Sequence, residues 1–269
     1  KTKYMKIPHL FYHRNETVLN MGANWNKCIS LAKNDWIKMM HDDDCFTSPQ
    51  TLQLIARQIQ SGNVQAMTFA YRNVHENGHA ENVVLHRLSY WMKNLFPFYV
   101  YKNNFIGNPC CLVYKRNIGI HYHDGLKWLV DVQFYLQLKL SGVHIQYCNK
   151  PVIDIGISTL QATNQYKHNL EVELNEHQTM AIQFRKQGYY KSYFTFDTIW
   201  RLVRNIGIER ASLADYVQDE AFKNYLSWII SKQSGYQSAT LKNPLFSLIL
   251  KGWYYVRYRL GGTEINFIQ

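Results

Sequence analysis

The chain has 269 residues, of which 46% are hydrophobic and 18% are charged. This length supports one large domain or two modest ones, and the composition excludes a disordered tail, a collagen-like fibre and a small disulfide scaffold. Lys and Arg number 30 against 19 Asp and Glu, and the resulting charge of +11 favours polyanionic partners such as nucleic acid, an anionic membrane surface or a phosphorylated substrate.

No apolar run reaches the roughly 20 residues that a membrane-spanning helix needs. No signal peptide is recognisable at Lys1, and the missing initiator Met leads us to expect a fragment of a longer chain. The five cysteines show no CxxC spacing, which argues against a zinc site and against a secreted disulfide framework. We therefore expect a reducing, cytoplasmic environment.

Apolar patterning predicts strands that alternate with helices in the first part of the chain. Residues 10–12 are a short candidate strand. Trp25, Cys28, Ile29 and Ala32 recur at helical spacing, and residues 36–40 form an apolar run suited to a central strand. Further elements are expected in this order: a helix starting at 47–50, strands at 64–71 and 110–114, a helix at 128–140, and strands at 143–148 and 152–157.

Beyond Leu170 the pattern becomes purely helical, with helices expected at 170–187, 196–206 and 213–232. Alternating strands and helices followed by helices alone indicate an α/β domain with a helical C-terminal appendage. We place the α/β domain at residues 1–188 and the helical region at 189–269.

Three adjacent carboxylates, Asp42, Asp43 and Asp44, are the sharpest feature of the sequence. They repel one another, so a buried fold would not keep them without a counter-charge. They follow the apolar run 36–40, which places them at the carboxyl end of a strand, where open α/β sheets bind ligands. Carboxylate oxygens there suit Mn²⁺ or Mg²⁺, which in turn hold a diphosphate. From spacing alone, an acidic turn on the solvated surface is an equal alternative.

Several segments, taken in order, resemble the middle of a family 2 glycosyltransferase with the GT-A fold, a Rossmann-like mixed sheet flanked by helices. The pattern is a Gly and an Asn that open a helix, followed by a strand that ends in a DxD motif. The resemblance covers roughly residues 10–180 and is carried by residues 20–27, 32, 36–44, 105–109, 114–116, 124–131, 155–158 and 161–163.

This resemblance implies roles for the acidic residues. Asp42 and Asp44 would be the outer carboxylates of the DxD motif, with Asp44 or Asp43 on Mn²⁺ or Mg²⁺ and Asp42 near the donor ribose. Asp131 would be the general base, which deprotonates an acceptor hydroxyl as it attacks the anomeric carbon opposite the leaving nucleoside diphosphate, with inversion. Without the resemblance, Asp131 is better explained as an acidic residue favoured at a helix N-terminus.

The same resemblance suggests the remaining site residues. Donor contacts are expected from Gly22, Asn24, Asn26 and Asp42, and acceptor contacts from Gly107, Asn108 and Trp128. Helix capping is an adequate alternative for the two asparagines, and core packing is an equal alternative for Trp128.

The chain also departs from the family pattern. The family begins with a strand, a helix and a second strand that grips the nucleotide base, and none of these is visible before Leu10. Either those residues are omitted from the sequence or the chain as given cannot hold a donor. The family often has a metal-binding His near the position of Ser158, for which His168 is a distant substitute.

Residues 241–260 combine basic side chains with Trp and Tyr and contain no acidic residue. This composition is typical of a helix at a membrane surface, and it would suit an acceptor carried on a lipid diphosphate in the cytoplasmic leaflet. A helix packed on the catalytic domain, with its basic residues in water, is an equal alternative.

The hypothesis is a metal-dependent, inverting glycosyltransferase (hexosyltransferase type) of surface polysaccharide synthesis, such as capsule or O-antigen. Its donor would be a nucleotide sugar, with UDP- or dTDP-sugars favoured, and its acceptor a saccharide or lipid-linked oligosaccharide. We expect a cytoplasmic protein at the inner face of the cell membrane that binds no nucleic acid. The alternatives are a metal-dependent nuclease or phosphotransferase on nucleic acid, and a non-catalytic module that binds sugar or lipid.

Overall fold

The computed structural model describes residues 9–61, 63–158, 166, 169–208 and 213–261. Its first half contains α1 (Met21–Leu31), β1 (Trp36–Lys38), β2 (Asp44–Phe46), α2 (Thr51–Gln60), β3 (Ala66–His75), β4 (Ala80–Val83), α3 (Arg87–Leu95), α4 (Tyr99–Lys102), β5 (Leu112–Lys115), α5 (Val130–Leu140) and β6 (Ile145–Ile157). The helical second half contains α7 (Leu170–Phe184), α8 (Tyr193–Ile206), α9 (Leu213–Tyr216), α10 (Glu220–Gln233), α11 (Ser238–Lys242) and α12 (Pro244–Leu260).

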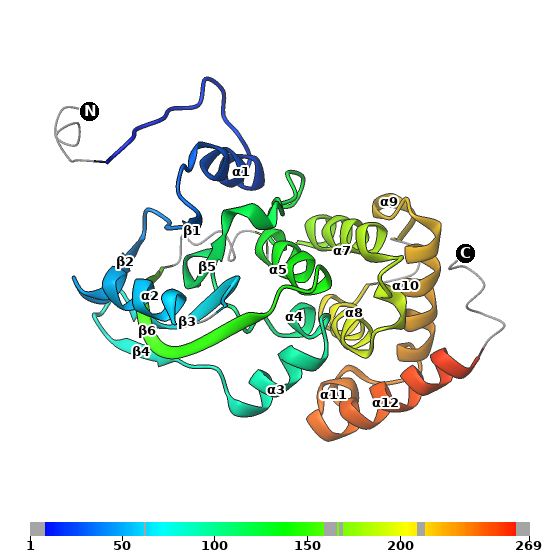
Figure 1. Ribbon diagram of the computed structural model, residues 1–269. Coiled ribbons are helices and arrows are strands. Elements are labelled where there is room, and N and C mark those ends of the chain that lie inside the picture. Colours follow the sequence, from blue (N-terminus) through cyan, green and yellow to red (C-terminus); the bar gives the residue numbers. More distant parts are fainter. Residues whose placement is uncertain (1–8, 62, 159–165, 167–168, 209–212, 262–269) are drawn as a thin grey trace.

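The strands form one mixed sheet in the order β1-β5-β3-β6-β2, with β4 paired to β3 beside this path. The central pair β3 and β6 is parallel, whereas the other pairs are antiparallel. Figure 1 shows the sheet and α2 on one side of the molecule, the helices from α7 onward on the other, and α5 between them. The predicted α/β class is therefore confirmed.

The two faces of the sheet bury different cores because side chains alternate along a strand. On β3, Ala66 faces the larger core, whereas Met67 and Phe69 face a smaller core beneath α2. The larger core continues from Ile29 of α1 through α5 to Tyr258 of α12. The helical second half therefore shares a core with the sheet, and the predicted division at residue 188 stays a prediction.

Several sequence-based boundaries differ from the structure for identifiable reasons. Residues 10–12 are not a strand, because none of the described strands pairs with them and their side chains are exposed. The expected strands 143–148 and 152–157 are one strand, β6, whose register against β3 shifts near Pro151, which has no backbone N–H for the ladder. The helix expected at 47–50 begins at Thr51, after a turn.

Two further differences concern helices. The helix expected at 213–232 is two helices, α9 and α10, because Asp219 caps a new helix start by accepting a hydrogen bond from the Phe222 N–H at 2.8 Å. Residues 109–111 form a short 3-10 turn that precedes β5, so the strand expected at 110–114 starts later. Among the described helices, none has the length and apolar character that crossing a membrane requires.

Candidate active site

Helix α1 is fixed against the loop at residues 122–124. Asn20 caps the helix by accepting a hydrogen bond from the Ala23 N–H at 2.9 Å. The Asn26 amide donates to the Tyr122 carbonyl at 2.8 Å and to Asp124 Oδ1 at 2.9 Å, and its oxygen accepts from the Tyr122 N–H at 2.9 Å. Gly22 is required at the contact, because a Cβ there would lie 2.4 Å from the His123 carbonyl oxygen.

The turn at residues 41–44 folds one carboxylate inward. The Asp44 side chain is only 1% exposed, and its Oδ2 lies 3.2 Å from His41 Nδ1. Burial alone would raise the pKa of Asp44, but contacts with His41 and Cys110 outweigh it and hold that pKa below its ordinary value. Asp44 is therefore a buried, ionised carboxylate. Asp42 and Asp43 are exposed in the same turn.

Three side chains at this turn come close enough to share a cation. His41, Asp44 and Cys110 each offer a ligand atom, and these atoms all lie within 4.8 Å of one another. Imidazole and carboxylate suit Mn²⁺, and His41 Nε2 is buried with no hydrogen-bond partner among the described residues. The Cys110 thiol is a poor ligand for a hard cation, because its hydrogen bond with Cys111 and its burial raise its pKa and keep it protonated. The His41–Asp44 pair fits such a cation.

Asp131 lies in the first turn of α5. Its Oδ2 accepts a hydrogen bond from the Asn104 amide at 2.9 Å, and its Oδ1 accepts from the Val132 N–H at 2.7 Å. Burial raises the pKa of Asp131 to about 6, although these two hydrogen bonds and the nearby His41 act in the opposite direction. A carboxylate with this pKa is ionised at neutral pH and is basic enough to take a proton from a hydroxyl.

Asn104 also holds the loop that precedes β5. It donates to the Gly107 carbonyl at 3.2 Å and accepts from the Gly107 N–H at 3.1 Å. Gly107 has φ +83°, and a Cβ there would lie 2.9 Å from the Tyr71 ring. Tyr135 of α5 donates to the same Gly107 carbonyl at 3.0 Å. One asparagine thus couples the Gly107 turn to Asp131.

A second buried carboxylate fixes the start of α5. Glu176 of α7 accepts hydrogen bonds from the N–H groups of Lys127, Trp128 and Leu129 at 2.5 to 3.0 Å. These donors lead into the first turn of the helix and otherwise lack helical partners. Because Asp131 follows directly, α7 determines where the candidate base lies.

Aromatic contacts link the 41–44 turn to α5. Trp25 stacks on His41 with ring centroids 5.4 Å apart, and its edge meets Tyr122 at 4.9 Å. Tyr122 in turn stacks on Phe134 of α5 at 4.2 Å. The burial of Tyr122 and the neighbouring Asp131 charge both raise the pKa of this tyrosine. The acidic turn and Asp131 therefore belong to one packed region.

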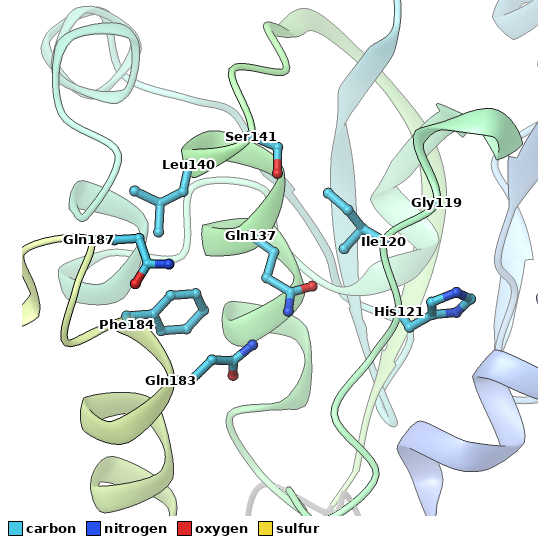
Figure 2. A pocket seen from close by; sticks show the side chains of 9 residues that line it. All are labelled: Gly119, Ile120, His121, Gln137, Leu140, Ser141, Gln183, Phe184 and Gln187. Carbon is cyan, nitrogen blue, oxygen red and sulfur yellow. The ribbon is translucent and has the colours of Figure 1, made fainter.

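Cavities lie on two sides of α5. One, of about 280 Å³, is lined by Trp128, Arg201 and Asn104, and Asn104 also donates to Asp131, which does not itself line the cavity. The other, of about 470 Å³, lies between the C-terminal part of α5, α7 and the loop at 119–121. Figure 2 shows three glutamines, Gln137, Gln183 and Gln187, around this second cavity, which contains none of the predicted site residues.

The structure thus joins part of the predicted set. Asn104 bonds both Asp131 and the Gly107 turn, and it lines the smaller cavity together with Trp128. Glu176 accepts a hydrogen bond from the Trp128 N–H. The Asn26 amide is instead bonded to the 122–124 loop. Sequence reasoning missed His41, Cys110, Asn104 and Glu176. A His three residues before Asp44 was a readable signal, but the other three are brought in by tertiary packing. Residues 161–163 and His168 lie outside the described residues. The predicted donor and acceptor contacts stay predictions.

Comparison with known proteins bears on this geometry. Residues 2–121 match the model of the family described as glycosyl transferase family 2. This match covers 120 of the 269 residues, so the first part of the chain is similar to that family. The matched region includes the 41–44 turn and ends before Asp131, so the role of Asp131 depends on geometry and on the resemblance.

Two further proteins are similar to this chain. It is 26% identical over 153 residues to an uncharacterized protein of Mycobacterium tuberculosis, a match that spans 48% of the chain and 44% of that relative. The chain therefore spans less than half the length of this curated relative. A crystal structure of S. aureus TarS 1-349 in complex with UDP-GlcNAc superposes with a TM-score of 0.51 at 13% identity, covering 89% of this chain and 70% of that one. The fold is GT-A-like, as the resemblance implied.

Proposed function

We propose that this chain transfers a sugar from a nucleotide-sugar donor to a hydroxyl of a saccharide or lipid-linked acceptor, by a single displacement that inverts the anomeric carbon. The observation that carries the proposal is Asp131, an ionised carboxylate with a pKa of about 6, held by Asn104 in the same packed region as the His41–Asp44 pair. The family match and the UDP-GlcNAc complex of the structural relative support a nucleotide-sugar donor.

The proposed division of labour follows from the positions of the groups. Asp131 accepts the proton of the acceptor hydroxyl, and Asn104 and the Val132 N–H keep its carboxylate oriented. The smaller cavity, with Trp128 on its wall, receives the acceptor, since an indole ring stacks well on a sugar face. Asp44 and His41 hold the divalent cation, with Asp42 and Asp43 on the solvent side of the turn. A divalent cation held there would supply positive charge against the departing diphosphate.

The cation site is tested by Mn²⁺ binding, measured by electron paramagnetic resonance with pyrophosphate or UDP present. Asp44→Asn is expected to weaken Mn²⁺ binding at least about tenfold, because a buried carboxylate ligand becomes neutral. Asp215→Asn, which removes an exposed carboxylate from α9, is the matched control and leaves binding unchanged. Equal Mn²⁺ binding by both variants would show that the cation does not bind at this turn.

The reaction is tested by the anomeric configuration of the product, read by proton NMR on freshly formed material. The proposal predicts inversion relative to the donor, whereas retention contradicts a single displacement with Asp131 as base. Salt-sensitive binding to DNA or RNA together with phosphodiester cleavage would favour the nuclease alternative. Binding of sugar without donor turnover would favour the non-catalytic module.

A further inference from the structure

Helix α12 is apolar on two opposite faces. Its inner face packs on α8, where Tyr255 meets Tyr193 at 5.2 Å and Tyr258 stacks on Phe196 at 6.1 Å. Buried Lys251 on the same face pairs with Asp197. The outer stripe, at residues 245, 248, 249, 253, 256 and 260, consists entirely of large apolar side chains that are 49% to 79% exposed. Spacings of three and four residues place these side chains on one helix face.

Helix α3 presents a similar stripe. Leu88, Trp91 and Leu95 recur at helical spacing and are 51% to 61% exposed. The opposite side of α3 is anchored by Lys93, whose buried ammonium donates to the Ile145 carbonyl at 2.6 Å. A soluble helix normally turns its apolar face inward, so two helices with exposed apolar stripes mark an interaction surface.

The two helices lie along the same side of the molecule. Phe96, at the end of α3, packs on Phe194 of α8 with centroids 5.3 Å apart. The adjacent Tyr193 packs on Tyr255 of α12. Figure 1 shows α3, α11 and α12 along the lower edge of the view. The start of α8 therefore packs against both helices, which are more than a hundred residues apart in the sequence.

Charge identifies the partner. No Asp or Glu occurs at positions 82–123 or 221–263, the two segments that contain these helices, whereas Lys and Arg number five and six there. Lys242, Arg257 and Arg259 are exposed at the two ends of the α12 stripe, and the Arg257 guanidinium lies 5.9 Å from the Trp253 ring centroid. Apolar side chains with Trp, bordered only by cations, match the boundary between acyl chains and anionic headgroups.

We propose that the outer stripes of α12 and α3 form one docking face that binds the surface of a membrane containing anionic lipids. The apolar side chains enter the interface, and the bordering Lys and Arg contact the headgroups. A second copy of the chain is a poorer occupant, because two such faces would bring like charges together. This inference does not depend on the proposed catalytic function, since the surface is separate from Asp131 and the 41–44 turn.

The experiment is cosedimentation of the full chain with phosphatidylcholine vesicles, with and without phosphatidylglycerol. Wild type is expected to bind the anionic vesicles and to bind neutral ones far more weakly. The double variant Ile249→Asp with Trp253→Asp is expected to lose at least about tenfold in partitioning onto anionic vesicles. Leu52→Asp, on a residue of α2 that is 58% exposed, introduces the same chemical change and is the matched control.

Two further variants separate the contribution of the α12 arginines from that of helix α3. Arg257→Gln with Arg259→Gln is expected to weaken binding to anionic vesicles roughly 30-fold, about a factor of five per charge, and to leave binding to neutral vesicles unchanged. Trp91→Asp tests whether α3 belongs to the same face and is expected to weaken binding as well. All altered side chains are exposed, so circular dichroism and melting temperature should match wild type.

Three results would overturn the proposal. Vesicle binding that responds no more to the α12 changes than to Leu52→Asp would remove α12 from the interface. Equal binding to neutral and anionic vesicles would show that the Lys and Arg side chains do not contact anionic headgroups. A dimer in light scattering that dissociates in the Ile249→Asp and Trp253→Asp variant would assign the face to a second copy. None of these results depends on donor turnover.

Discussion

Replacing Asn104 by Ala should raise the pKa of Asp131 and move the acid limb of the activity profile. The Asn104 amide donates to Asp131 Oδ2 at 2.9 Å and lowers the pKa that burial has raised to about 6. A hydrogen bond to a charged group contributes about 1.5 kcal/mol, which is roughly one pKa unit, and the partial exposure of Asp131 makes this an upper value. The pKa in the variant is therefore expected near 7.

The assay is kcat/KM for sugar transfer between pH 5 and 9, together with carboxyl-carbon NMR of Asp131 in the free protein. With the pKa raised by one unit, the ionised fraction at pH 5.5 falls about eightfold relative to wild type, but the two proteins converge above pH 8.5. Asn103→Ala is the matched control, because Asn103 contacts Tyr99 rather than Asp131. A pH profile for Asn104→Ala that superposes on wild type would refute the assignment of Asp131 as base.

Three other substitutions test how the site is held. Gly22→Ala places a Cβ against the His123 backbone, so thermal unfolding should show a loss of about 1–3 kcal/mol; unchanged stability would mean that α1 does not pack there as described. Asp197→Ala leaves buried Lys251 without its carboxylate partner, so the free energy of unfolding should fall by about 2–3 kcal/mol. This figure is reduced from that of a fully buried pair because Lys102 and Arg201, which also contact Asp197, are partly exposed. Burial would raise the pKa of Asp197, but the neighbouring cations lower it below its ordinary value of 3.8. The stability difference between wild type and Asp197→Ala should therefore be complete above pH 3.8 and disappear as the pH falls through the lowered pKa. A difference that grows in acid would contradict the ion-pair explanation. Glu176→Gln, read by donor turnover and calorimetry, should lower both kcat and stability by weakening the contacts at the start of α5, and wild-type kcat would show that Glu176 does not position Asp131.

The sequence was sufficient for features that depend on local pattern. The helix containing Trp25 and Ile29, the buried strand before the aspartates and the helical second half all follow from residue spacing. Asn77 and Gly78, between β3 and β4, are a hairpin signal of the same local kind, and Gly78 has φ +81° there. Such signals are read within one turn or one strand, and they locate elements well while leaving their ends uncertain.

The features that the sequence did not predict depend on long-range packing. Asn104 reaches Asp131 across 27 positions, and Glu176 caps α5 from 47 to 49 positions away. Cys110 reaches Asp44 because the 3-10 turn at 109–111 contacts β6, the strand that pairs with β2. Three adjacent aspartates suggested one cluster, yet the backbone turn sends Asp44 inward and leaves Asp42 and Asp43 exposed. Neighbouring residues in a turn point in different directions, so adjacency alone does not predict which carboxylate is buried.

The central claim, that Asp131 takes the acceptor proton while the cation is held elsewhere, is tested most directly by Asp131→Asn. Turnover of donor and acceptor is compared with Mn²⁺ binding on the same preparation. Asparagine keeps the size of the side chain but cannot accept the proton, so turnover should fall about 100-fold or more while Mn²⁺ binding stays at the wild-type level. Wild-type turnover in Asp131→Asn would contradict the account.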